Sequence, residues 1–154
     1  MIIIQDTREK YPWDFSFYNA ETKVKGLKTG DYSLCGLETK TCIERKRNTG
    51  EIAINLGFKW KQFSNELLRM CLFNHKIIIM EFDEYDLDVF PKKSSIPENK
   101  WSQIRMSAGF LKKRLYSIKD TYDIDIIFCP SKEQAEQQAY NFLLESYEKE
   151  NKIG

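Results

Sequence analysis

The stretch CIERKRN, residues Cys42–Asn48, begins like the end of a β-strand and then becomes strongly charged. Thr41 and Ile43 are residue types that suit a pleated surface. Glu44 and Lys46 are two positions apart, and residues at that spacing on a strand point to the same face. A strand with a purely structural role rarely needs an acid and a base side by side. The pattern therefore suggests chemistry at the end of this strand.

A second acidic residue lies upstream, in the segment Gly30–Tyr32. A turn at Gly36 is expected to join this strand to the Glu44 strand, and the resulting hairpin would bring Asp31 close to Glu44. Two adjacent carboxylates repel unless a cation lies between them, and Mg²⁺ prefers oxygen ligands. Lys46 could then act on water or phosphate. The D-(x)n-E-x-K pattern is loose, however, and a surface hairpin with an ion pair is the alternative interpretation.

Composition places the chain among single globular domains. It has 154 residues, of which 42% are hydrophobic and 31% charged, and its formal net charge is +1. This net charge does not by itself indicate a nucleic-acid partner, so any attraction to phosphate must come from local clusters of lysine and arginine. No apolar stretch is long enough to predict a membrane span.

The cysteines are widely spaced, without the pairs typical of zinc sites: Cys35, Cys42, Cys71 and Cys129. We expect reduced, mostly buried thiols in an intracellular protein of the cytoplasm or nucleus, not a secreted one. His75 is the only histidine, which argues against His-based catalysis.

Hydrophobic periodicity predicts strands alternating with helices. The expected strands are Met1–Gln5, a segment around Val24, 31–35, 39–45, 76–82 and 123–129. The expected helices are 58–74, a helix from a Ser95/Glu98 capping box through Trp101 to Ile118, and a last helix capped by Ser131. This order predicts an α/β fold, with a partly parallel sheet covered on both sides.

The segment 83–99, DEYDLDVFPKKSSIPEN, is expected to be an acidic, exposed loop within this single domain. Its four carboxylates at 83, 84, 86 and 88 could suggest calcium. The segment lacks the glycine and the closing glutamate of a calcium-binding loop, so the plain loop is favoured.

Three motifs together resemble a known family. QDTREK at 5–10, LKTGDY at 27–32 and CIERK at 42–46 are similar to the D-x-R-E, G-D-Y and E-R-K motifs of the XPF-type structure-specific endonucleases, in the PD-(D/E)xK nuclease superfamily. Order and spacing agree, and the resemblance covers residues 1–150. It implies a restriction-endonuclease-like central mixed sheet flanked by helices. Neither the tandem helix-hairpin-helix module nor the helicase of larger relatives is expected in this chain.

The resemblance implies a metal site. Asp31 and Glu44 would ligate Mg²⁺ or Mn²⁺, with the backbone carbonyl of Arg45, and Asp6 would add a carboxylate through water. The implied reaction is hydrolysis of DNA phosphodiester bonds, leaving 5′-phosphate and 3′-hydroxyl ends, in branched or otherwise structured DNA.

The resemblance also assigns supporting roles. Lys46 would serve the attacking water, Arg8 and Arg45 would clamp phosphate or brace the site, and Glu9 would support it. One departure from the family is that Glu51 falls one position late after the E-R-K motif, which weakens any role for it.

DNA binding is expected to come from basic residues grouped around the site: Arg8, Lys10, Lys28, Arg47, Lys59 and Lys61. Without helix-hairpin-helix domains, a homodimer or a protein partner joined through the helical side is expected. Two other functions stay open: a catalytically silent subunit of a nuclease complex, and a plain DNA-binding or interaction module.

The aromatic residues beside the first motif, Tyr11, Trp13 and Phe15, could stack on an unpaired base. Plugging the edge of the sheet is the favoured alternative. Trp60 and Trp101 are assigned to the core or an interface.

Overall fold

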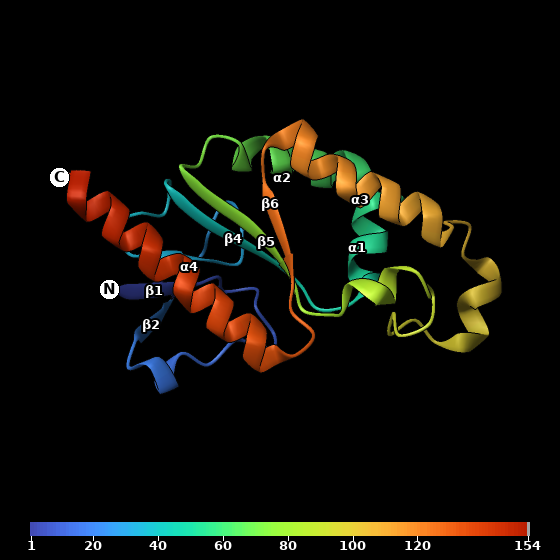
Figure 1. Cartoon of the computed structure of the whole chain (residues 1–154), viewed down its shortest axis with the longest axis horizontal. Helices are drawn as coiled ribbons and strands as arrows, with labels where there is room; N and C mark the ends of the chain where they lie inside the picture. Colours follow the sequence, from blue (N-terminus) through green and yellow to red (C-terminus); the bar gives the residue numbers. More distant parts are fainter. Residues whose placement is uncertain (154) are drawn as a thin grey trace.

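A six-stranded mixed sheet forms the centre of the molecule in the computed structural model, which describes the backbone of residues 1–153 and the side chains of residues 1–152 (Figure 1). Its strand order is β2-β1-β3-β4-β5-β6. The strands are β1 (Ile2–Gln5), β2 (Glu21–Val24), β3 (Tyr32–Leu34), β4 (Thr41–Lys46), β5 (His75–Met80) and β6 (Asp125–Phe128). The β1–β3 and β3–β4 pairs are antiparallel, and the other pairs are parallel. The predicted α/β class with a mixed sheet is confirmed.

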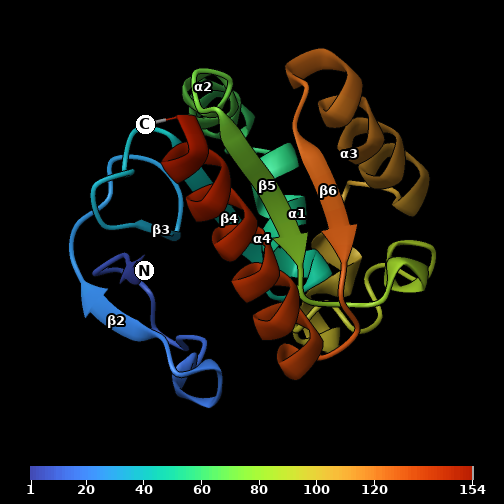
Figure 2. The ribbon, with the colours of Figure 1, turned by 60° about the vertical axis from the view of Figure 1, so that its left-hand side comes forward.

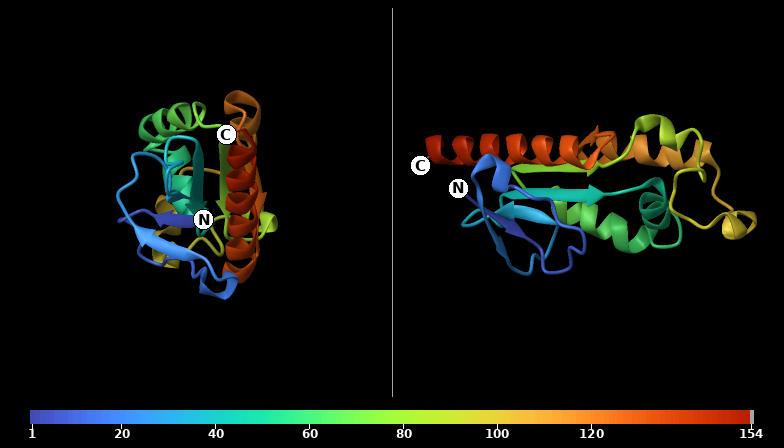
Figure 3. Two further views of the ribbon diagram at one scale, coloured as in Figure 1. Left: turned by 90° about the vertical axis from the view of Figure 1, so that its left-hand side faces the viewer. Right: turned by 90° about the horizontal axis from the view of Figure 1, so that it is seen from below.

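Helices cover both faces of the sheet. They are α1 (Thr49–Leu56), α2 (Trp60–Met70), α3 (Ala108–Tyr122) and α4 (Lys132–Ile153). Helix α4 runs across one face, and α1 to α3 lie on the other (Figures 2 and 3). Each face has its own hydrophobic core, one around α4 and one around α1 to α3. No helix within the described residues is both long enough and apolar enough to cross a bilayer.

Strand β4 is central and buried along its whole length, so its alternating side chains enter both cores. Cys42 belongs to the core under α1 to α3, whereas Ile43 belongs to the core under α4. Glu44 and Lys46 continue the face of Cys42, and Arg45 continues the face of Ile43. The period of the strand therefore separates the acid and the ammonium from the guanidinium.

The close approach of the chain before β3 to strand β4 requires glycine at position 30. Gly30 has φ +84°, and a Cβ there would lie 2.5 Å from Cys42 Sγ and 3.0 Å from the Ile43 carbonyl oxygen. The next residue, Asp31, donates its N–H to that same carbonyl at 2.7 Å. This close approach and hydrogen bond fix Asp31 beside β4, and the antiparallel pairing of β3 with β4 agrees with the predicted hairpin.

The helix predicted at 58–74 is shorter, and a helix before it was missed. Asn48 caps α1 by accepting the Glu51 N–H at 2.9 Å, a signal that the sequence carries as Asn followed three residues later by Glu. Gly57 ends α1, and α2 starts at Trp60.

The Ser95/Glu98 capping box was also wrong. Ser95 has φ +67°, residues Glu98–Gln103 form a 3₁₀ turn, and Ser107 is the true cap, accepting the Phe110 N–H at 3.1 Å. The chain bends at Ile104, because the extended backbone there separates the turn from α3.

The loop 83–99 was predicted to be exposed, but part of it is buried. Asp86, Leu87, Phe90 and Ser94 are buried, and Leu87 and Phe90 join the core under α1 to α3. The prediction weighed the acidic residues and overlooked the apolar ones between them, which anchor the loop.

Candidate active site

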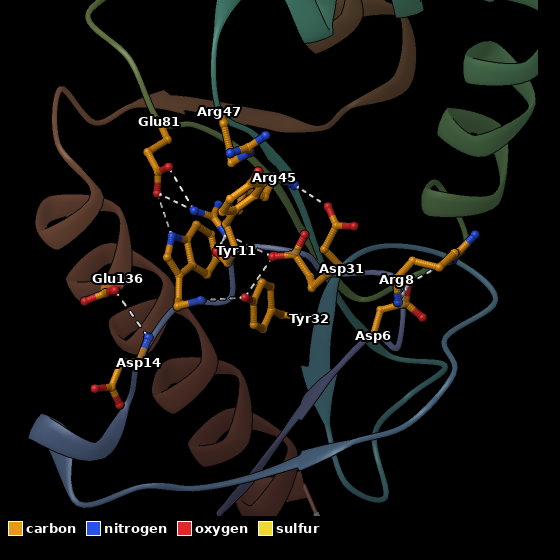
Figure 4. A network of polar contacts seen from close by, with 12 residues as sticks. Asp6, Arg8, Tyr11, Asp14, Asp31, Tyr32, Arg45, Arg47, Glu81 and Glu136 are labelled. Carbon is orange, nitrogen blue, oxygen red and sulfur yellow. Dashed lines mark hydrogen bonds and ion pairs between the residues drawn. The ribbon is translucent and has the colours of Figure 1, made fainter.

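Residues from all three motifs line one cavity of about 220 Å³ at the end of β4. Figure 4 shows some of them, among them Arg8, Asp31 and Arg45, from close by. The cavity is lined by Arg8, Glu9, Lys10, Tyr11, Asp31, Glu44, Arg45, Lys46, Arg47 and Glu51. Three of the predicted DNA-binding residues, Lys28, Lys59 and Lys61, are exposed but do not line it.

Asp31 and Glu44 form the acidic part of the site. The Arg45 backbone N–H donates to Asp31 Oδ2 at 2.8 Å. Burial raises the pKa of Asp31 well above its usual value, and the charge of Glu44 acts in the same direction. Crowding of this kind favours either a shared proton or a cation between the carboxylates.

Lys46 and Glu44 form a buried pair, with Lys46 Nζ 3.3 Å from Glu44 Oε1. Burial alone would raise the pKa of Glu44, but the Lys46 charge and hydrogen bonds hold it below its usual value. Burial would likewise lower the pKa of Lys46, but the charges of Glu44 and Asp31 raise it. The Lys46 ammonium also lies 5.1 Å from the centre of the Phe63 ring on α2. Lys46 is therefore a protonated cation within an acidic cluster.

Glu66, on α2, is an acidic neighbour that sequence reasoning missed. Burial raises its pKa to about 8, and the hydrogen bond to Glu44 and the charge of Glu44 add to this. The sequence carried a signal for this position. Glu66 lies three positions after Phe63 and one before Leu67, and both of these apolar residues are buried on the inner side of α2. A carboxylate on the inward face of a helix needs a partner.

Asp6 is buried beside the cavity and does not line it. Its Oδ1 accepts the Leu27 N–H at 2.8 Å, and its Oδ2 accepts Arg8 Nε at 2.7 Å. Burial would raise the pKa of Asp6, but these hydrogen bonds lower it. The carboxylate thus ties the end of β1 to the segment before Gly30, which disfavours the predicted role in binding a metal through water.

Arg45 braces the site from the α4 side of the sheet. Its side chain is only 2% exposed, and its guanidinium donates to Glu9 Oε2 at 2.9 Å and to both carboxylate oxygens of Glu81 at 2.9 and 3.0 Å. Figure 4 shows this network at the end of β4. Of the two predicted roles for Arg45, clamping phosphate or bracing, this burial favours bracing.

The aromatic residues complete the brace. Trp13 donates its ring N–H to Glu81 at 2.7 Å and stacks on Tyr32, whose hydroxyl donates to Glu9 at 2.9 Å. Trp13 and Phe15 are 3% and 1% exposed, so they fill the core and are not available to stack on a base.

The rim of the cavity carries a more accessible pair. The Arg47 guanidinium lies 4.1 Å from the centre of the Tyr11 ring, which is 57% exposed. Glu51 accepts Arg47 Nε at 3.1 Å and so fixes the position of the arginine. Glu51 thereby gains a supporting place in the site despite its shift in the motif.

The residues present fit a divalent cation. Glu44 Oε2 is buried and has no hydrogen-bond donor among the described residues, and it lies beside the crowded Asp31. Within the described part of the chain, no three His, Cys, Asp or Glu side chains are already arranged as a metal cage. A cation here would therefore need water as well as Asp31 and Glu44, which suits Mg²⁺.

The comparison with protein families decides the relationship. The family model for the ERCC4 domain matches residues 5–142. The chain belongs to the ERCC4 domain family. No curated protein matches this ERCC4 domain in sequence.

Solved structures share the fold of this ERCC4 domain. XPF from Aeropyrum pernix matches with a TM-score of 0.68 and 16% identity, over 95% of this chain and 61% of that one. XPF from Aeropyrum pernix in complex with DNA matches with a TM-score of 0.67 and 17% identity, over 96% of this chain and 65% of that one. The resemblance to XPF-type nucleases is confirmed, and this chain spans less than two thirds of either structure's length.

Proposed function

We propose that this ERCC4 domain is an endonuclease that uses Mg²⁺ or Mn²⁺ to hydrolyse phosphodiester bonds in branched or otherwise structured DNA, leaving 5′-phosphate and 3′-hydroxyl ends. The observation that carries the proposal is the meeting of Asp31, Glu44 and Lys46 in one cavity at the end of β4. Family membership supports it, as does the fold shared with an XPF solved in complex with DNA.

Asp31 and Glu44, with the backbone carbonyl of Arg45, would hold the divalent cation. When bound, the cation would neutralise charge on the scissile phosphate and make water more acidic. The buried brace of Arg45, Glu9 and Glu81 keeps the end of β4 rigid, so that these oxygen ligands stay in place.

Lys46 would act through its positive charge. Because its pKa is raised, the side chain stays an ammonium at neutral pH and has no lone pair with which to accept a proton. It can donate hydrogen bonds to the attacking water and to a phosphate oxygen, and it can stabilise charge that develops in the transition state. This favours orientation and electrostatic stabilisation over a general-base role.

The rim residues would grip the DNA backbone. Arg8, Lys10 and Arg47 line the mouth of the cavity, and the Arg8 side chain is 72% exposed. Guanidinium and ammonium groups in such positions neutralise phosphates and release counterions. Tyr11, held against Arg47, offers a ring face to an unpaired base.

A nicking assay on DNA substrates of one sequence, built as duplex, fork, flap and four-way junction, tests the proposal. We expect cutting with MgCl₂ or MnCl₂ that EDTA abolishes. Asp31→Asn and Glu44→Gln should each abolish cutting while the circular dichroism spectrum is kept. Asp88→Asn, which alters an exposed carboxylate outside the cavity, is the matched control. DNA binding without cutting under every metal condition would identify a silent subunit instead.

We further propose that two copies, or this chain and a partner, join through the helical side. An apolar groove of about 840 Å³ lies between α1 and α3, and Ile54, Phe58 and Phe110 at its edge are 42%, 83% and 45% exposed. Light scattering should show a dimer that Phe58→Asp converts to a monomer. A strict monomer that is fully active at high concentration would contradict this.

A further inference from the structure

Three cationic side chains lie on the short segment that leads into β3. The Arg8 guanidinium donates from Nη2 to the Leu27 carbonyl at 3.0 Å, and the Arg69 guanidinium, on α2, donates from Nε to Thr29 Oγ1 at 3.1 Å. Lys28 stands between these two contact points in the chain and is exposed. Arg8, Lys28 and Arg69 thus meet from three separate parts of the sequence, and together they are called the basic platform below.

The segment under the basic platform is fixed on both sides. Leu27 donates its N–H to Asp6 Oδ1 at 2.8 Å, and Asp31 donates its N–H to the Ile43 carbonyl of β4 at 2.7 Å. Leu27 and Thr29 are both buried, so the segment packs against the rest of the domain. Because Asp31 comes only two positions after Thr29, the platform keeps a constant distance from the acidic residues of the active site.

The charges of Lys28 and Arg69 are available to an anion. Both residues are exposed, and none of the ion pairs between the side chains of residues 1–152 involves either of them. Arg69 uses one of its N–H donors on Thr29, and its other donors can reach an anion. Arg8 is more engaged, since Asp6 accepts its Nε at 2.7 Å, but its side chain is 72% exposed. A guanidinium that is already held by a fixed neighbour loses less conformational freedom when it binds a phosphate.

We propose that the basic platform binds consecutive phosphates of the DNA strand that leaves the active site on the side of α2. This inference rests on the proposed function, because it takes the cavity as the place where the strand is cut. Arg8 joins the two sites, since it lines the cavity and contacts the segment of the platform. A strand that passes Arg8 meets Lys28 and Arg69 next. Because these cations are tied to the segment that carries Asp31, they fix which phosphate of the strand reaches the acidic residues.

The experiment measures binding to a DNA fork by fluorescence anisotropy, in EDTA and over a series of salt concentrations, so that no cutting occurs. The double variant Lys28→Ala with Arg69→Ala should flatten the slope of log affinity against log salt by roughly two, since each lost phosphate contact removes about 0.9. Lys149→Ala with Lys152→Ala is the matched control, because it removes the same charge from exposed positions at the end of α4, on the other face of the sheet. This control should keep the slope of the original chain. An equal change in the two double variants would show that only net charge matters, and would overturn the inference.

Two further readouts separate phosphate binding from a structural role. Arg69→Lys keeps the positive charge but loses the Nε contact with Thr29, so it should keep the salt slope; a slope as flat as that of the double variant would mean that Arg69 only holds α2 in place, and would overturn the inference.

In the second readout, single phosphates of the fork are replaced in turn by uncharged methylphosphonates. The original chain should lose affinity at neighbouring positions of one strand, and the double variant should not respond at these positions. The same response in both proteins would overturn the inference. The expected binding pattern in a chain that never cuts DNA would support the inference and overturn the proposed function, whereas a chain that cuts DNA but shows no such pattern would do the reverse.

Discussion

Replacing Glu66 by glutamine should change how the stability of the metal-free protein depends on pH. The pKa of Glu66 is raised from 4.5 to about 8 in the folded chain, first by burial and then by Glu44. Between these two values the unfolded chain has lost the proton that the folded chain keeps. The free energy of unfolding therefore falls as pH rises through this window, and the contribution levels off above pH 8.

The magnitude follows from the proton linkage. One proton difference changes the free energy of unfolding by at most about 1.4 kcal/mol per pH unit, or about 2.7 kcal/mol between pH 5 and pH 7. Partial contact of Glu66 with solvent at the site reduces this, and we expect about 2 kcal/mol. Glutamine does not titrate, so Glu66→Gln should lose this part of the slope and gain stability relative to the original chain as pH rises.

Urea unfolding followed by circular dichroism, in EDTA at pH 5, 6 and 7, measures the effect. Glu148→Gln, at an exposed position on α4, is the control and should follow the original chain at every pH. Asp31 contributes a slope of the same sign in both proteins, because its pKa is also raised, so only the difference between the two curves is diagnostic. Parallel curves for the original chain and Glu66→Gln would refute the reasoning.

The remaining predictions concern chemistry, DNA binding and folding. Lys46→Ala should leave DNA binding nearly intact and lower the single-turnover rate about 100-fold or more. The double variant Lys59→Ala with Lys61→Ala should flatten the slope of log affinity against log salt by roughly two and leave the rate at saturating DNA unchanged. If both variants lose the same property, DNA binding and catalysis are not divided between these residues as proposed. Gly30→Ala should destabilise the chain by about 3 kcal/mol in urea unfolding, because its Cβ meets Cys42 Sγ and strains the backbone. Gly36 also has φ +84°, but no atom lies within 4 Å of the place that its Cβ would take, so Gly36→Ala should lower the free energy of unfolding by only about 1 kcal/mol. Equal losses in the two variants would mean that the contact with Cys42 Sγ is unimportant.

Much of this site could be predicted from local pattern. The order of the strands along the chain, the turn at Gly36 that pairs the Asp31 strand with the Glu44 strand, and the common face of Glu44 and Lys46 all follow from residue type and the two-residue period of a strand. These are properties of a few neighbouring residues, so they do not depend on how distant segments pack. The same holds for the cap at Asn48, whose signal was present but overlooked.

Only the tertiary structure decided which distant groups meet these residues. The strand period puts Arg45 on the face opposite to Glu44 and Lys46, but only the fold decides that Glu9 and Glu81, from the segments that follow β1 and β5, meet it there. Glu66 comes near Glu44 only because α2 packs on the face of the sheet that carries Glu44 and Lys46, with Phe63 of α2 under the Lys46 ammonium. A periodic pattern tells which face a side chain takes, but not what lies opposite it. The partner is set by strand order and helix packing. These raise the pKa of Glu66 to about 8, so that its carboxyl group stays protonated at neutral pH, and they raise the pKa of Lys46, which stays a cation. They also make Asp6 a structural carboxylate, because its hydrogen bonds lower its pKa.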